Sequence, residues 1–293
     1  MAKVHRSAVI EGDVRLAEDV TVGPNCVLDG TLGPLVVGAG CVLVAGAYLN
    51  GPLTMGERNV VYPGACLGFS PQDLGFDPNK PGTGAVIGSS NIFREGFTLH
   101  RGKTTEPTRI GNHNFFMTNS HVGHDSVVDN HCILASGALL GGHVHLADRV
   151  ILGGNALVHQ FCRLGKGCMF SGGVGVSMDV PMWFTVTSIN LAGSLNIVGM
   201  RRNGLTQHQI HTVRWVYRVL YRSGSTPQQA LPQLQERADD PLVREYLEFI
   251  QSSKRGICHG VSRATRGGTG GVHGPRTVPG SPHAFPVDVD LKP

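Results

Sequence analysis

The sequence predicts an all-β left-handed parallel β-helix, a hexapeptide-repeat solenoid, followed by a small α-helical C-terminal domain. The first observation is a large apolar residue at every sixth position from Ile110 to Val176, without one miss. The second is a row of mostly small residues two positions earlier in each repeat, from Ser120 to Val174. Neither the helical period of 3.6 nor the strand period of 2 produces this spacing. A chain that turns a corner every six residues closes three short faces into a triangular coil of about 18 residues per turn.

The repeat covers residues 1–190, which we expect to form the β-helix. Earlier runs of the same spacing begin at Ile10 and Val37. Two stretches, 70–85 and 101–108, interrupt the pattern. In a solenoid an insertion becomes a loop at a corner, and such loops often carry function. We therefore predict insertion loops at these two places.

The period changes after the repeat ends. Downstream of Leu205 the apolar residues recur at helical spacing. Thr226 and Asp240 each precede a proline, the combination that marks an N-cap and the first residue of a helix. Residues 191–255 are therefore predicted to form an α-helical domain.

The charge of the chain is concentrated at its C-terminal end. The formal net charge is +4, and residues 254–293 carry six basic and two acidic residues, so the remainder is neutral. A folded basic surface for nucleic acid is therefore not expected. Residues 256–293 are rich in Gly, Pro, Arg and His with few large apolar residues, and we expect a disordered tail there.

The cysteines and the hydropathy of the sequence indicate the cellular compartment of the protein. The seven cysteines show no paired spacing, and five of them occupy the row of small residues: Cys26, Cys41, Cys132, Cys162 and Cys168. We expect these to be buried free thiols in a reducing cytoplasm. No stretch approaches about 18 uncharged apolar residues, so neither export nor a membrane span is predicted.

Counting in steps of eighteen brings several of the 14 histidines together on neighbouring coils. Gly142 and Gln160 fall above His124, His143 falls above Asp125, and His159 falls above Gly141. An imidazole can take the proton of an attacking hydroxyl, and a carboxylate can fix its tautomer. The backbone N–H of a glycine can approach a developing oxyanion. The patch contains no Ser or Cys nucleophile beside a base, so direct acyl transfer is favoured over a covalent intermediate.

Two other interpretations remain open at this point. Several neighbouring histidines can bind zinc, and hexapeptide-repeat carbonic anhydrases of the γ type place such a metal between subunits. A structural solenoid without catalytic activity is the other alternative. The mixture of Gly, Gln and Asp with histidine favours acid–base chemistry without a metal.

A string of motifs resembles the UDP-N-acetylglucosamine O-acyltransferases, which open lipid A biosynthesis in Gram-negative bacteria. The resemblance covers about residues 1–255 and is far more specific than the repeat alone. The motifs, in order, are Gln72-Asp73-Leu74, His100-Arg101-Gly102, Asn119-Ser120-His121-Val122-Gly123-His124-Asp125, Leu140-Gly141-Gly142-His143-Val144, Val158-His159-Gln160-Phe161-Cys162, Asp179-Val180-Pro181, Arg201-Arg202-Asn203-Gly204 and Tyr221-Arg222-Ser223-Gly224.

The resemblance implies a role for each matching position. His124 would be the general base, Asp125 its orienting carboxylate, and the amide of Gly142 the oxyanion donor. Gly172 would act as an acyl-chain ruler together with Met169, and the missing side chain predicts a long acyl group. The substrate-binding positions would be Asp73, His100, His121, His143, His159, Gln160, Asn196 and Arg202.

The resemblance also implies the partners. The donor would be a (3R)-3-hydroxyacyl acyl carrier protein, the acceptor the 3-position of UDP-N-acetylglucosamine, and the assembly a homotrimer, with no cofactor and no metal. Arg214, Arg218 and Arg222, four apart on a predicted helix, would dock the acidic carrier protein.

Two departures from the family pattern concern the acceptor. Gly75 stands where a lysine commonly follows Gln-Asp-Leu, and Asn203 follows Arg201-Arg202. A related enzyme that acylates a 3-amino sugar is therefore kept as an alternative.

Overall fold

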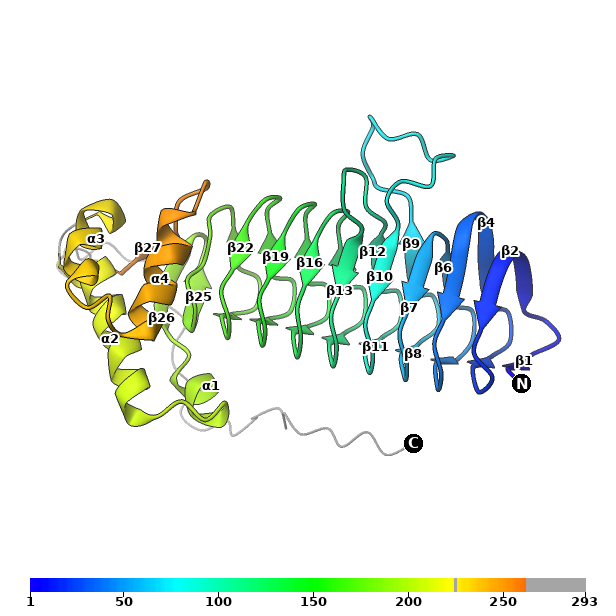
Figure 1. Cartoon of the computed structure of the whole chain (residues 1–293), viewed down its shortest axis with the longest axis horizontal. Coiled ribbons are helices and arrows are strands. Elements are labelled where there is room, and N and C mark those ends of the chain that lie inside the picture. The colour runs from blue at the N-terminus through cyan, green and yellow to red at the C-terminus, as the bar shows by residue number, and fades with distance from the viewer. Residues whose placement is uncertain (224–225, 262–293) are drawn as a thin grey trace.

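The computed structural model describes residues 1–223 and 226–261. They form a left-handed β-helix, an elongated three-sided coil, with the N-terminus at one end and four helices packed at the other (Figure 1). One loop stands well clear of the coil near its middle (Figure 1). No helix in the described residues is long and apolar enough to cross a membrane.

The three faces of the coil are ladders of short parallel strands. Two long strands near the N-terminus, β2 (Val9–Leu16) and β4 (Val27–Val37), run along two faces in turn, and β4 pairs with both β6 and β7. The first face holds β1 (Lys3–Val4), β3 (Thr21–Val22), β5 (Val42–Leu43), β8 (Val60–Val61), β11 (Ile92–Phe93), β14 (Phe115–Phe116), β17 (Ile133–Leu134), β20 (Ile151–Leu152), β23 (Met169–Phe170) and β25 (Phe184–Ser188). The second holds β7 (Leu53–Met55), β10 (Ala85–Ile87), β13 (Thr108–Ile110), β16 (Val127–Val128), β19 (His145–Leu146) and β22 (Arg163–Leu164). The third holds β6 (Tyr48–Asn50), β9 (Cys66–Phe69), β12 (Thr98–His100), β15 (His121–Val122), β18 (Leu139–Leu140), β21 (Leu157–Val158) and β24 (Gly175–Val176).

The core follows the six-residue period of the sequence. Every sixth residue from Ile110 to Val176 is buried, because its side chain points into the triangular interior. The five cysteines of the small row are buried free thiols, as predicted. The strands pair in steps of eighteen, for example His121 with Leu139 and Leu139 with Leu157. The columns inferred by counting are therefore confirmed.

Four helices close the C-terminal end of the coil. They are α1 (Ile197–Arg202), α2 (Gln207–Arg222), α3 (Pro227–Gln235) and α4 (Pro241–Gln251). Thr226 caps α3 and Asp240 caps α4, each before a proline, as the sequence indicated. Tyr246 of α4 and Tyr217 of α2 donate hydrogen bonds to the carbonyls of Met182 and Ala192, which joins the helices to the last coil.

The structure corrects the predicted boundaries at two places. Strand β26 (Leu191–Leu195) pairs antiparallel with β25, so the first residues of the expected helical domain extend the first face. Strand β27 (His259–Gly260) pairs with β26, and Cys258 is fully buried with its carbonyl accepting from the Tyr221 hydroxyl at 2.6 Å. The expected disordered tail therefore does not begin at residue 256, because Ile257 forms a bridge with Asp179 and His259–Gly260 pair with β26. Residues 262–293 lie outside the described residues.

Candidate active site

The corner between β15 and β16 carries His124 and Asp125, the two residues for which the sequence predicts acid–base chemistry. Asp125 adopts φ +58° there, and His143 and Phe161 repeat this left-handed corner on the next two coils. The amide of His143 donates to the carbonyl of His124 at 2.9 Å, which stacks the two corners. The repeat itself therefore brings His124, Asp125 and His143 together.

His124 and Asp125 form a tightly hydrogen-bonded pair. The Nδ1 atom of His124 lies 2.5 Å from Oδ2 of Asp125, and their side chains are 15% and 4% exposed. Burial raises the pKa of Asp125, but hydrogen bonds from Thr104, His124 and Lys103 outweigh it and hold that pKa below its usual range. An ionised Asp125 keeps the proton on Nδ1, which leaves Nε2 of His124 free as an acceptor.

Gly142 lies directly against the free edge of the His124 ring. A Cβ atom on Gly142 would lie 2.8 Å from both Cε1 and Nε2 of His124. Within the described residues, the Gly142 amide donates no hydrogen bond. The site thus has an acceptor nitrogen and an unpaired N–H donor side by side, the two functions that acyl transfer to a hydroxyl needs.

Further imidazoles line the neighbouring coil positions. His143 Nε2 lies 3.7 Å from Asp125 Oδ2, and its ring stacks on Phe161 with centroids 4.5 Å apart. His100 and His121 meet edge to face at 4.6 Å, and His121 Nδ1 shares a hydrogen bond with Thr98 Oγ1 at 2.7 Å. Burial, with smaller contributions from the charges of His121, His124 and Arg101, lowers the pKa of His100 to about 4. This ring is therefore neutral at physiological pH.

A groove of about 650 Å³ runs from this corner along the third face. Its walls include seven of the predicted positions, namely Asp73, His100, His121, His124, Gly142, His159 and Gln160. Beyond His124 the floor becomes apolar, with the outward side chains of Leu139 and Leu157 41% and 50% exposed. The groove thus joins a polar end at the histidines to an apolar strip toward β24.

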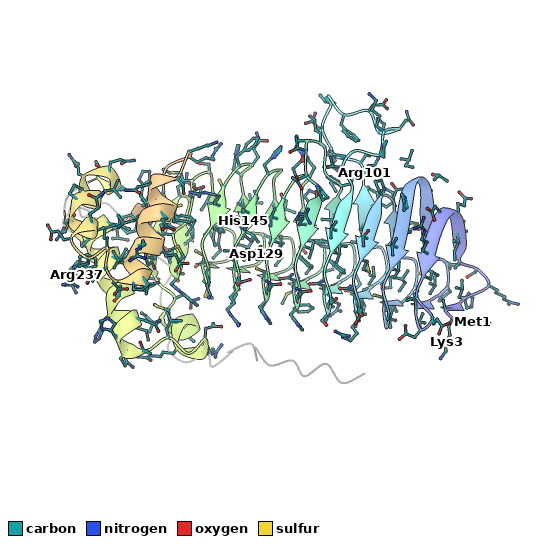
Figure 2. All side chains as sticks on the ribbon, in the orientation of Figure 1. Met1, Lys3, Arg101, Asp129, His145 and Arg237 are labelled. Atoms are coloured by element: carbon teal, nitrogen blue, oxygen red, sulfur yellow. The ribbon has the colours of Figure 1, made fainter. Side chains whose placement is uncertain are left out.

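The two insertion loops complete the polar end. They pair with each other at Gly84 and Gly102, and Lys103 Nζ binds Asp73 Oδ2 at 2.6 Å. Arg101 anchors the larger loop and is only 1% exposed, at the root of the projecting segment (Figure 2). Its guanidinium donates to Asn50 and to the carbonyls of Gly68, Pro78 and Lys80.

The remaining predicted residues do not line the groove of this chain. Met169 lies on β23 of the first face, and Gly172 lies at the corner beside Gly173, which does line the groove. Asn196 caps α1 and donates to the carbonyl of Gly167, and Arg202 is exposed at the end of the same helix. The docking candidates Arg214, Arg218 and Arg222 are exposed on α2.

Several residues of the site were missed by sequence reasoning. Leu139 and Leu157 stand in the column above His121 and could have been found by the same counting. Arg255 donates to the Ser177 carbonyl at 2.9 Å and reaches Nδ1 of His159 at 3.3 Å. No spacing rule in the sequence connects that arginine to the coil.

The metal alternative has a geometric basis but is not favoured. One ligand atom each of His124, Asp125 and His143 could lie within 4.8 Å of one another. However, Oδ2 of Asp125 already holds His124 Nδ1, and its Oδ1 accepts hydrogen bonds from Lys103 and Thr104. The group is thus already arranged as an acid–base pair.

Comparison with known proteins identifies the family. The profile of the UDP-N-acetylglucosamine O-acyltransferase domain 2 family matches residues 179–258, and that of the bacterial transferase hexapeptide family, six repeats, matches residues 107–142. The acyl-(acyl-carrier-protein)–UDP-N-acetylglucosamine O-acyltransferase of Stutzerimonas stutzeri is 40% identical over 262 residues, covering 88% of this chain and 99% of the relative. That of Pseudomonas aeruginosa is 40% identical over 261 residues, with the same coverage of 88% and 99%.

Solved structures agree with the sequence relatives. The UDP-N-acetylglucosamine acyltransferase of Francisella novicida superposes with a TM-score of 0.83 at 32% identity, over 89% of this chain and 95% of that one. The enzyme of Acinetobacter baumannii gives a TM-score of 0.80 at 35% identity, over 87% and 99%. The chain described here therefore belongs to the UDP-N-acetylglucosamine O-acyltransferase family.

Proposed function

We propose that this enzyme transfers a (3R)-3-hydroxyacyl group from acyl carrier protein to the 3-hydroxyl of UDP-N-acetylglucosamine, the first step of lipid A biosynthesis. The observation that carries the proposal is the His124–Asp125 pair set against the unpaired amide of Gly142. Family membership supplies the reaction class, and this geometry supplies the groups that the reaction needs. No cofactor or metal is required beyond the phosphopantetheine of the donor.

The steps follow from the placement of these atoms. His124 Nε2 takes the proton from the sugar hydroxyl, whose oxygen attacks the thioester carbonyl carbon. The Gly142 N–H stabilises the oxyanion of the tetrahedral intermediate, and ionised Asp125 stabilises the imidazolium. As the C–S bond breaks, His124 returns the proton to the departing thiolate. The amide of Gly154, at the same repeat position, likewise donates no hydrogen bond within the described residues, but of these two glycines only Gly142 lies against an imidazole.

The groove divides the two substrates between its ends. The apolar strip over Leu139 and Leu157 suits the acyl chain, which would gain about 0.8 kcal/mol for each buried methylene. The strip runs toward Gly173, so a ruler at Gly172 with Met169 remains our proposal, and the open corner at Gly172 favours a long chain.

The polar end suits the sugar nucleotide. Asp73, His100, His121, His143, His159 and Gln160 offer hydrogen-bonding groups around the reacting hydroxyl. Asn196 and Arg202 lie outside this groove, so we assign them to the nucleotide site of a neighbouring copy in a homotrimer. Arg214, Arg218 and Arg222 form an exposed cationic row on α2 that would steer the acidic carrier protein. The free thiols are consistent with a cytoplasmic enzyme.

The test is a comparison of two histidine–aspartate pairs, His124–Asp125 and His145–Asp129. His145 Nε2 lies 3.1 Å from Asp129 Oδ2, and both residues are labelled in Figure 2. Neither residue lines the groove. We expect His124→Ala to lower kcat by about 10²- to 10⁴-fold, the usual contribution of a general base. His145→Ala should keep wild-type turnover with acyl carrier protein thioester and UDP-N-acetylglucosamine.

Three results would overturn the proposal. Near wild-type turnover of His124→Ala would exclude His124 as the base. Preference for a 3-amino acceptor over UDP-N-acetylglucosamine would reassign the acceptor. Stoichiometric zinc in the purified protein, with activity lost on chelation, would favour the metal alternative.

A further inference from the structure

The carboxylate of Asp125 is held by more than its histidine. Its Oδ1 atom accepts three hydrogen bonds from two consecutive residues of the smaller insertion loop. They come from the hydroxyl of Thr104 at 2.6 Å, the amide of Thr104 at 2.8 Å and the amide of Lys103 at 3.1 Å. Oδ2 is thereby left to face His124.

These three donors to Asp125 come from outside the regular repeat. The Lys103-Thr104 segment belongs to an interruption of the hexapeptide pattern, and the loop is tied into the coil at both of its ends. Arg101 is buried at its start, and the Thr108 hydroxyl, fully buried at its end, accepts from the Asp125 amide at 2.8 Å. The loop is therefore anchored on both sides of the segment that binds the carboxylate, although Thr104 itself is exposed.

The same segment also holds the second carboxylate of the site. Lys103 binds Asp73 through its ammonium group while its amide binds Asp125. The charged or titratable groups that face Asp125 are Lys103 from this loop, Asp73 through that lysine, His124 from the same corner and His143 from the next coil. Two carboxylates from separate segments are thus fixed by one dipeptide.

We infer that Thr104 is a positioning residue for the transfer reaction, because its hydroxyl and amide orient Asp125 so that one carboxylate oxygen always meets His124. The inference rests on the proposed function, in which His124 is the base. Thr104 does not line the groove, so it acts through Asp125 and leaves substrate binding unaffected. After burial, which acts in the opposite direction, the Thr104 hydroxyl is the leading influence on the pKa of Asp125 and lowers it.

The experiment uses the full-length enzyme and the neighbouring threonine as a control. Thr104→Val removes the hydroxyl and keeps the shape, whereas Thr105 is exposed and has no hydrogen-bonded side chain in the described residues. We expect kcat of Thr104→Val to fall about tenfold, the scale of one hydrogen bond to a charged group, with KM for UDP-N-acetylglucosamine within about twofold of wild type. Thr104→Ser should restore the rate, and Thr105→Val should leave it unchanged.

The pH profile separates positioning from a merely structural role. Loss of a donor to the ionised carboxylate raises the pKa of Asp125, so the acid-side fall of kcat/KM should move to higher pH in Thr104→Val and return in Thr104→Ser. Equal kcat and equal profiles for Thr104→Val and Thr105→Val would overturn the inference, as would a change confined to KM. His124→Ala is measured in parallel. A dead His124→Ala with a fully active Thr104→Val rejects only the role of Thr104, whereas an active His124→Ala rejects the proposed function.

Discussion

Replacing Gly142 by alanine tests how closely the proposed oxyanion donor and the proposed base, His124, are packed. The added Cβ would lie 2.8 Å from Cε1 and Nε2 of His124 and 3.3 Å from Cδ2. Ordinary contact between such atoms begins near 3.5 Å, so the ring must retreat by about 0.7 Å. This movement strains the hydrogen bond between His124 Nδ1 and Asp125 Oδ2, which are 2.5 Å apart.

The expected result is a large loss of rate with little loss of stability. Displacement of a catalytic group by about 1 Å costs on the order of 100-fold, so kcat of Gly142→Ala should fall about 10²-fold. The amide of residue 142 is still present in the variant, so the fall in kcat measures the displacement of His124, the proposed base. The free energy of unfolding should change by less than about 2 kcal/mol, since only one hydrogen bond to a carboxylate is strained.

Gly154 provides the matched control. It occupies the same position of the hexapeptide two repeats later, and a Cβ there would meet only the Ser136 carbonyl oxygen, at 3.5 Å. Release of holo acyl carrier protein measures turnover, and urea unfolding measures stability. If Gly142→Ala keeps kcat within about threefold of Gly154→Ala, His124 does not occupy the position from which we derive the mechanism.

Three further predictions concern stability, loop order and chain length. The pKa of His100 is about 4 in the folded protein and near 6.5 in an unfolded chain, so the unfolded state binds more protons between these values. The free energy of unfolding should therefore fall by up to about 3 kcal/mol as the pH drops from 6.5 to 4, and His100→Gln should flatten this slope in urea titrations. Arg101→Met removes two hydrogen bonds to the larger loop, so chymotrypsin should cut after Phe76 about tenfold faster, whereas the surface variant Arg109→Met should match wild type. A Cβ at Gly172 would be in ordinary contact with the Gly154 carbonyl oxygen at 3.4 Å, so we expect Gly172→Met to fold. Mass spectrometry of products from mixed donors should then show shorter acyl chains, and an unchanged distribution would exclude a ruler there.

The site could be predicted from sequence where the coil is regular. His124, Gly142 and Gln160 were placed on adjoining coils because one turn takes eighteen residues and each residue pairs with the one a turn later. In such a solenoid a fixed separation along the chain becomes a fixed position in space. The positions of His124, Gly142, His159 and Gln160 in the groove needed no other information.

The contacts of the loops and the C-terminal end could not be predicted in this way. Lys103 meets Asp73 across 30 positions, and Arg255 meets His159 across 96. No periodicity in the sequence predicts the burial of Cys258 or the pairing of β27 with β26 either. These segments lack a repeat, so their neighbours depend on how each one folds back onto the coil.

The amino-acid sequence by itself determined the triangular coil, its interior rows and the columns that bring His124, Asp125 and Gly142 together. Only the tertiary structure decided which other residues contact that site and line the groove beside it. It placed Thr104 and Lys103 on the Asp125 carboxylate, turned Leu139 and Leu157 into the floor of a groove, and left Asn196 and Arg202 outside it. The physical reason is that short-range periodic packing is encoded locally, whereas loops and helices find their partners through burial and hydrogen bonds over long separations.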